Sequence, residues 1–141
     1  MIKNDNIRKI LTTDVLSVHV NQKLSDVNKI FRENMIHHVP VLKGKKPIGI
    51  ISTNDIFKLM FNIEIQEDDR MLDAIMDHHF SIKDAMSKDL VTLPITSTIK
   101  DITKILQFST IHSVIITNEA GELEGIVTST DLIKHLHDNI N

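Results

Sequence analysis

Two short stretches of the chain place a glycine, β-branched residues, hydroxyl residues and a carboxylate in the same order. They are Gly49-Ile50-Ile51-Ser52-Thr53-Asn54-Asp55 and Gly125-Ile126-Val127-Thr128-Ser129-Thr130-Asp131. β-Branched residues favour strands, whereas Ser, Thr and Asp favour the first turn of a helix. Each stretch is therefore predicted to be a strand that leads into a helix. We call them the first corner (49–55) and the second corner (125–131).

The residue types in both corners are suited to binding a sugar phosphate. A carboxylate can accept hydrogen bonds from two ribose hydroxyls, which makes Asp55 and Asp131 candidate sugar ligands. A helix N-terminus attracts phosphate through its unpaired N–H groups and its dipole. The glycines Gly49 and Gly125 would let a ligand approach the strand closely. The hydroxyl residues placed to receive a phosphate are Ser52, Thr53, Thr128, Ser129 and Thr130.

The same residues also have a purely structural interpretation, which the sequence leaves open. An Asp in a first helical turn interacts favourably with the helix dipole, and a Ser or Thr before it caps the helix. Apolar β-branched residues near the corners are core residues first. On the binding interpretation Val39, Ile50, Val114 and Ile126 also form walls for a purine, and backbone groups near Val18 or Leu93 contact its edge.

Composition excludes several classes of protein. The 141 residues include no Cys, so disulfides and thiolate chemistry are excluded, and aromatic residues make up only 4%. No run of 18 apolar residues and no apolar leader occur, so the protein is expected to be cytoplasmic, without a membrane partner. The net charge of −3 divides into −5 over residues 63–80 and +2 over the rest of the chain. This mildly positive remainder lacks the dense basic face that a nucleic acid requires, but it leaves room for a small anion. The motifs Gly-x-Ser-x-Gly and the Gly-Lys-Ser/Thr phosphate loop are missing, so no enzyme is predicted.

An internal repeat organises the chain. Identical residues 75 positions apart include Ile7 and Ile82, Asp26 and Asp101, and His37 and His112; after one extra residue in a turn, Gly49 and Asp55 match Gly125 and Asp131. Apolar periodicity predicts short strands at 15–18 and 90–93, hairpins at 39–52 and 114–128, and closing helices at 54–62 and 130–138. Each copy thus reads β-α-β-β-α, an α/β (α+β) fold. The predicted divisions are repeat 1 at 1–62, a linker at 63–80 and repeat 2 at 81–141.

The linker is predicted to be an acidic amphipathic helix. Residues 63–80 contain six acidic residues and one arginine, and Met71, Leu72, Ile75 and Met76 share one helical face. Asp68 or Asp69 could cap its start. The simplest interpretation of the acidic residues is a solvated face, with the Met-rich side covering the core or contacting a second subunit. No metal site is predicted, because neither His78 with His79 nor His135 with His137 places both rings on one helical face.

The two ordered copies resemble the tandem cystathionine β-synthase (CBS) domain family, whose paired repeats form a Bateman module. The resemblance covers about 7–60 and 82–136, and is to a stand-alone module. It implies two repeats related by a pseudo-twofold axis, a flat homodimer, and an adenosine nucleotide or S-adenosylmethionine in one or both clefts between the repeats. In that family the Asp at this position of the motif holds the ribose, so the resemblance implies this role for Asp55 and Asp131.

The family often carries basic residues before the second strand, where they reach the phosphate. His37, His38 and His112 occupy these positions here, with Ser113 beside His112. Histidine binds phosphate only when its pKa rises, so AMP or ADP is expected more than ATP. We therefore predict a regulatory module that senses an adenosine nucleotide, requires no cofactor and acts on another protein. The alternative is a structural or partner-binding dimer that binds no nucleotide.

Overall fold

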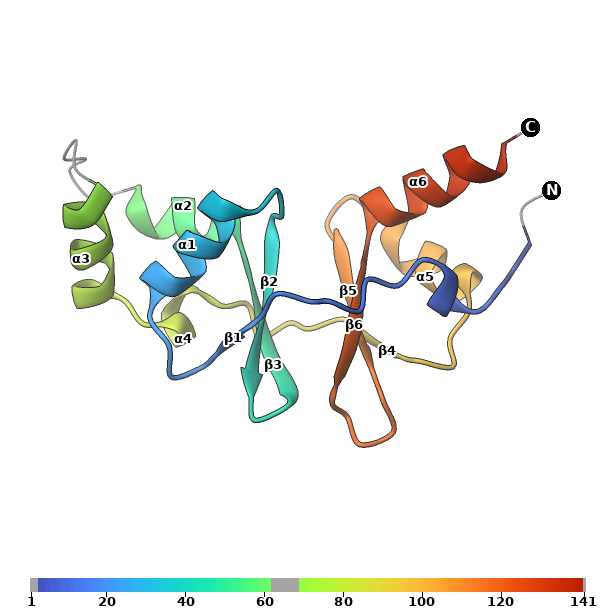
Figure 1. Cartoon of the computed structure of the whole chain (residues 1–141), viewed down its shortest axis with the longest axis horizontal. Coiled ribbons are helices and arrows are strands. Elements are labelled where there is room, and N and C mark those ends of the chain that lie inside the picture. Colours follow the sequence, from blue (N-terminus) through green and yellow to red (C-terminus); the bar gives the residue numbers. More distant parts are fainter. Residues whose placement is uncertain (1–2, 62–68, 141) are drawn as a thin grey trace. The chain divides into compact units, whose positions relative to one another are not determined.

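The computed structural model describes residues 3–61 and 69–140, and the chain divides into two compact units. The continuous unit runs from Leu16 to Asp89, and the split unit combines residues 1–15 with residues 90–141. Each unit is a three-stranded sheet with helices packed on one side (Figure 1). The chain therefore passes between the units twice, after Val15 and after Asp89.

The continuous unit contains one parallel and one antiparallel strand pair: β1 is parallel to β2, and β2 is antiparallel to β3. Leu24, Val27 and Ile56 from its helices join Val39, Val41 and Ile51 of the sheet in one aliphatic core. The elements are β1 (Val18–His19), α1 (Leu24–Glu33), β2 (His38–Lys43), β3 (Lys46–Ser52), α2 (Thr53–Met60), α3 (Asp69–His79) and α4 (Ile82–Ala85).

The split unit repeats this arrangement, with β4 parallel to β5 and β5 antiparallel to β6. Ile102 and Leu106 pack with Val114, Ile116 and Val127, and Ile7 from the N-terminal segment is fully buried in the same core. The elements are the 3-10 helix η1 (Ile7–Lys9), β4 (Thr92–Pro94), α5 (Ile99–Leu106), β5 (Ser113–Thr117), β6 (Leu123–Thr128) and α6 (Ser129–Asn139).

The predicted order of elements is confirmed in both copies, but the two first strands are displaced. The sequence predicts strands at 15–18 and 90–93, whereas β1 begins only at Val18 and β4 only at Thr92. The reason is pairing: Val18 is the first residue that reaches its partner strand, opposite Val41, and Thr92 is the first opposite Ile115. The residues just before them carry the chain from one unit to the other. The closing helices end within two residues of their predicted bounds, apart from Asn62, which lies outside the described residues.

Each sheet carries a short additional segment on its edge, which we call a strap. The first strap, Leu11–Thr12, lies on β6: Thr12 and Ile126 exchange two backbone hydrogen bonds of 3.1 Å. The second strap, Met86–Ser87, lies on β3, where Ser87 and Ile50 exchange bonds of 2.9 and 3.0 Å. Both straps stand immediately before the chain leaves a unit.

The straps explain Gly49 and Gly125, and they correct the expectation that these glycines make room for a ligand. A Cβ at Gly49 would lie 2.5 Å from the Sδ of Met86. A Cβ at Gly125 would lie 2.5 Å from the carbonyl oxygen of Thr12 and would also collide with Leu11. At Gly125 a Cβ would force the Thr12 backbone to shift, whereas at Gly49 the flexible Met86 side chain would have to move. In both corners the space beside the glycine is already occupied by the strap.

Helix α3 packs against α1 through both apolar and acidic residues. Met76 is 1% exposed in the core of the continuous unit, which confirms the predicted apolar face, although Met71 remains 47% exposed. Asp77 accepts hydrogen bonds from the N–H (2.9 Å) and hydroxyl (2.5 Å) of Ser25. Asp73 pairs with Arg32 at 3.1 Å. The expectation of a fully solvated acidic face is therefore wrong for Asp73 and Asp77, which hold α3 on α1.

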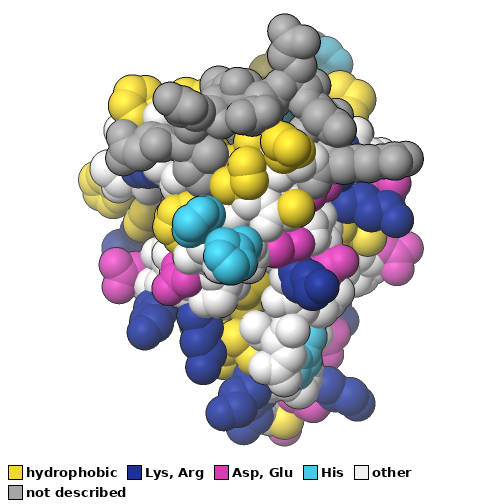
Figure 2. Space-filling model, turned by 90° about the vertical axis from the view of Figure 1, so that its left-hand side faces the viewer, with side chains coloured by type: hydrophobic (Ala, Val, Ile, Leu, Met, Phe, Trp, Pro, Cys, Tyr) yellow, Lys and Arg dark blue, Asp and Glu magenta, His cyan; other side chains and the backbone are white. Residues whose placement is uncertain are grey.

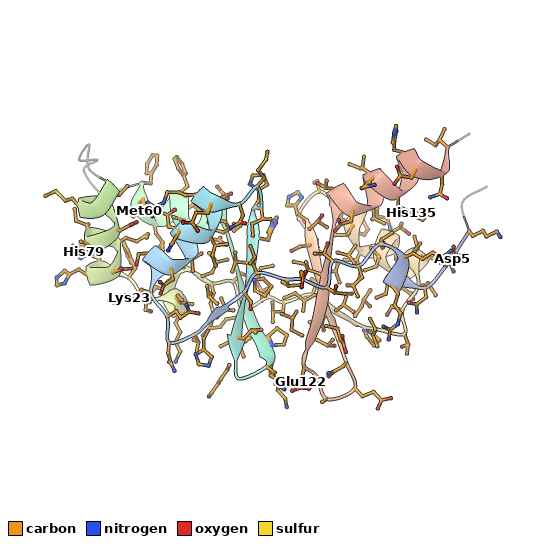
Figure 3. All side chains as sticks on the ribbon, in the orientation of Figure 1. Asp5, Lys23, Met60, His79, Glu122 and His135 are labelled. Carbon is orange, nitrogen blue, oxygen red and sulfur yellow. The ribbon has the colours of Figure 1, made fainter. Side chains whose placement is uncertain are left out.

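The outward side of α3 is mixed in character. Figure 2 views this side and shows apolar, acidic and histidine side chains interspersed. His79 points away from α1 (Figure 3) and is exposed, and its ring meets that of His78 edge to face at 5.1 Å. Of the residues that could cap this helix, Asp68 lies outside the described residues. Within the described part of the chain, no helix has the length and apolar character needed to cross a bilayer.

Candidate functional site

The first corner is closed by reciprocal hydrogen bonds between Ser52 and Asp55. The N–H of Ser52 donates to the Asp55 carboxylate at 2.8 Å, and the N–H of Asp55 donates to the Ser52 hydroxyl at 3.1 Å. This is a capping box, which satisfies N–H groups at the start of α2. Only one oxygen of the Asp55 carboxylate takes part. A carboxylate has about four lone-pair sites, so Asp55 can still accept two hydroxyls of a sugar.

The second corner has the same construction with an additional bond. The Asp131 carboxylate accepts the N–H of Thr128 at 2.7 Å and the Thr128 hydroxyl at 3.0 Å. The N–H of Asp131 donates back to the Thr128 hydroxyl at 3.3 Å. The two bonds that the carboxylate accepts end on the same oxygen, and the third bond ends on the Thr128 hydroxyl. Asp131 therefore also keeps acceptor capacity, on the carboxylate oxygen that the box does not use.

Capping boxes also occur at two helices outside the corners. Ser81 and Asp84 form one at α4, and Thr98 and Asp101 form one at α5, as the sequence predicted for Thr98. Hydrogen bonds from the backbone N–H of Ser81 and Thr98, and then from their hydroxyls, lower the pKa of Asp84 and of Asp101. The capping geometry therefore does not by itself identify a site. What distinguishes the corners is that β3 and β6 run directly into their boxes.

The backbone N–H groups that could receive a phosphate are partly used. The N–H of Thr53 donates to the His37 carbonyl at 3.0 Å, and the N–H of Ser129 donates to the His112 carbonyl at 3.2 Å. The hydroxyls of Ser52 and Thr128 already accept hydrogen bonds in the capping boxes. Among the described residues, the corner groups that remain available as donors include the hydroxyls of Thr53, Ser129 and Thr130 and the N–H groups of Asn54 and Thr130, which lie in the first turns of α2 and α6.

The histidines predicted to reach a phosphate do lie beside the corners. His37 and His112 supply the carbonyl groups just described, and both side chains are exposed. His38 pairs with Ser52 across β2 and β3, and Ser113 pairs with Thr128 across β5 and β6. Each unit thus brings the residue before its second strand to the start of its closing helix.

The predicted apolar walls fall into two groups. The side chains of Val18, Val39 and Val114 are buried in the cores of their units, and Leu93 packs against the same core as Val114. Ile50 and Ile126 lie outside these cores, because they alternate with Ile51 and Val127 and so face the opposite side of the sheet from the helices.

Two further residues share the face of Ile50 and Ile126 and were not singled out as wall candidates. Pro40 lies opposite Ile50, and Ile115 lies opposite Ile126. The period-2 alternation of a strand was the signal that could have found them. Pro40, Ile115 and Ile126 are themselves buried, with Ile115 1% and Ile126 8% exposed, whereas Ile50 is half-buried. On this face Ile50 therefore keeps the most surface for apolar contact beside its corner.

The family model named CBS domain matches residues 7–62 and again residues 82–138. These two ranges make up most of the chain and contain both corners. The chain belongs to the CBS domain family. It carries a tandem pair of CBS repeats, as the ordered motifs predicted.

Curated relatives of this CBS pair include two proteins of Methanocaldococcus jannaschii. The uncharacterized protein MJ1232 is 28% identical over 95% of the chain, and the uncharacterized protein MJ1426 is 28% identical over 94% of it. The chain spans 95% of MJ1426 but about half, 47%, of MJ1232.

Solved structures with the same fold include the CBS domain pair of protein MJ0100 in complex with 5′-methylthioadenosine and S-adenosyl-L-methionine. Its TM-score is 0.79 at 19% identity, with 98% of this chain and 100% of that chain covered. Another is the CBS domain of the bacterial CNNM/CorC family Mg²⁺ transporter in complex with ATP. Its TM-score is 0.75 at 19% identity, with 96% and 89% covered.

Proposed function

We propose that this CBS pair is a regulatory module that binds an adenosine nucleotide at one or both corners. The observation that carries the proposal is the position of Asp55 and Asp131. Each carboxylate stands where a strand ends and a helix begins, and each is held by its box through one oxygen while further lone pairs stay available. The MJ0100 pair and the CorC domain, which share the fold, are in complex with adenosine-containing ligands.

The proposed roles follow the chemistry of each group. Asp55 and Asp131 accept the ribose hydroxyls. The hydroxyls of Thr53, Ser129 and Thr130, with the N–H groups of Asn54 and Thr130, donate to phosphate. Ser52 and Thr128 hold the carboxylates in position, and Ile50 and Ile126 contact the purine. The side chains of His37, His38 and His112 approach the phosphate, in addition to the backbone bonds that His37 and His112 already make.

A monophosphate or diphosphate suits these donors better than a triphosphate. Two of the first N–H groups of each closing helix are used internally, and Arg32 is paired with Asp73. Because few hydrogen-bond donors remain free at each corner, they would compensate only part of the negative charge of a triphosphate. AMP or ADP is therefore the proposed ligand, and no reaction on it is proposed. Occupancy would be sensed by another protein.

Isothermal titration with AMP, ADP, ATP and S-adenosylmethionine tests the proposal. We expect Asp131→Ala and Asp55→Ala each to weaken binding at one corner at least tenfold, because each removes the proposed sugar acceptor. Asp101→Ala and Asp84→Ala are the matched controls, since they remove the same kind of capping carboxylate elsewhere and should leave binding unchanged. No heat from any of the four ligands, in protein shown to be free of nucleotide, would refute it.

A second function is favoured by the exposed apolar side chains of the closing helices. Phe57 is 65% exposed and Ile133 is 66% exposed, and the two are equivalent positions of the repeat. Such faces suit a homodimer, and a structural dimer without nucleotide would need nothing more. The two functions differ in a thermal melt: a nucleotide binder is stabilised by its ligand through mass action, whereas a structural dimer melts at the same temperature with and without nucleotide.

A further inference from the structure

The two straps connect the corners to the passages between the units. Each strap is bonded to the strand residue two positions before the capping residue: Thr12 to Ile126, before Thr128, and Ser87 to Ile50, before Ser52. Ile50 and Ile126 are also the residues proposed to contact the purine. In each corner one strand residue is bonded to the strap through its backbone and, on the proposed function, would contact the ligand through its side chain.

Beyond each strap the chain leaves the unit almost at once. The first strap ends at Thr12 and the split unit ends its N-terminal segment at residue 15, while the second strap ends at Ser87 and the continuous unit ends at Asp89. The connecting residues, Thr13–Val15 and Lys88–Asp89, contain no glycine. Because so short a connection has few soft dihedrals, a displaced strap displaces the start of the next unit.

Each strap is held on its strand by close packing as well as by the two backbone hydrogen bonds. Gly125 leaves space that the Thr12 carbonyl and the Leu11 side chain fill, and Gly49 leaves space that Met86 fills. A well-packed contact has few alternative arrangements, so strand and strap move together.

We propose that the straps carry the regulatory signal: a nucleotide at a corner shifts β3 or β6, and the strap bonded to that strand changes the orientation of one unit relative to the other. The inference rests on the proposed function, because it requires a nucleotide to bind. It adds which backbone contacts transmit the occupancy. It also assigns Gly49 and Gly125 to transmission rather than to ligand contact.

The test uses the full chain, whose lack of cysteine allows specific labelling. Lys45→Cys and Ala120→Cys place one spin label in the exposed hairpin turn of each unit. Pulsed electron resonance then measures the distance between the labels without nucleotide and with saturating AMP, ADP or ATP. We expect nucleotide to shift the distance distribution in this parent, and Gly125→Ala to lose at least half of the shift at saturation. Glu124→Ala, an exposed neighbour on β6, is the matched control and should keep the shift.

Gly49→Ala is the second variant, because its added methyl meets the flexible Met86 side chain rather than a backbone atom, and it applies if Gly125→Ala does not fold. The inference is overturned by a parent that binds nucleotide without a change in distance, by glycine variants that keep the whole change, or by folded glycine variants that no longer bind. Absence of binding in the parent titration is a different result, since it removes the proposed function itself.

Discussion

Asp101 and Asp131 occupy equivalent capping boxes, yet they differ in what surrounds them. Asp101 is exposed on α5 and accepts hydrogen bonds from the N–H and hydroxyl of Thr98 at 2.9 and 3.0 Å. Asp131 is half-buried in the first turn of α6, directly after β6, and makes the same pair of contacts with Thr128. Comparison of the two carboxylates therefore separates the effect of losing a cap from the effect of losing a ligand.

The Asp101 cap should make stability depend on acid pH. The backbone and hydroxyl bonds from Thr98 lower the pKa of Asp101 in the folded chain. Because the pKa of Asp101 is lower in the folded chain than in the unfolded chain, these bonds stabilise the fold fully above the unfolded pKa of about 3.9. The stabilisation is lost as the pH falls below that value and through the folded pKa. Asp101→Asn should thus be less stable than the parent at pH 6, with a difference that shrinks by pH 2.5. Urea unfolding at both pH values measures this, and a difference independent of pH would contradict it.

At the scale of the elements, α3 is attached to α1 because a carboxylate of α3 caps the start of α1. The Asp77 carboxylate accepts both the N–H and the hydroxyl of Ser25, in the first turn of α1. The residue that would normally cap α1, Lys23, makes no side-chain cap. The acidic helix therefore supplies what the first repeat lacks in its own sequence.

Asp77→Ala should lower the free energy of unfolding by about 1 kcal/mol, the usual effect of losing an N-terminal cap. The measurement is urea unfolding followed by circular dichroism. Asp138→Ala is a suitable control, since its ion pair with Lys134 is largely exposed and contributes little. An equal effect of the two substitutions would show that Asp77 does not cap α1.

The elements also show what the sequence could and could not predict. Hydroxyl and acidic residues three positions apart predicted the Thr98 box, and period 3.6 predicted the buried face with Met76. The straps were not predicted, because each depends on a single pair of backbone bonds between residues far apart in the chain. Gly49 and Gly125 were correspondingly assigned to a ligand. The contacts of Asp73 and Asp77 were missed because a run of acids contains no indication of which ones find a partner.

At the scale of the whole molecule, each unit combines segments from both copies of the repeat. The split unit takes its first 15 residues from the start of the chain, including the buried Ile7 and the first strap. The repeated motifs predicted two copies of one fold, and the family match confirms them. The pattern of motifs did not predict this exchange of segments. Identical residues show which positions of the two copies are equivalent, but they do not show which copy a given segment packs against.

The exposed closing helices predict association of whole molecules. Phe57 and Ile133 stand at equivalent positions of α2 and α6. We expect a homodimer in sedimentation, and a shift of at least tenfold toward monomer in Ile133→Glu, because a charge would be placed in an apolar interface. Lys104→Glu, exposed on α5, should leave the dimer intact. A parent that is monomeric at high micromolar concentration would exclude the dimer.

The most direct test of the proposed binding is a crystal structure of the chain with AMP or ADP. The prediction is a ribose whose two hydroxyls lie within hydrogen-bonding distance of the Asp55 or Asp131 carboxylate, with the phosphate beside Thr53 or Thr130. A nucleotide bound with its ribose away from both carboxylates would contradict it.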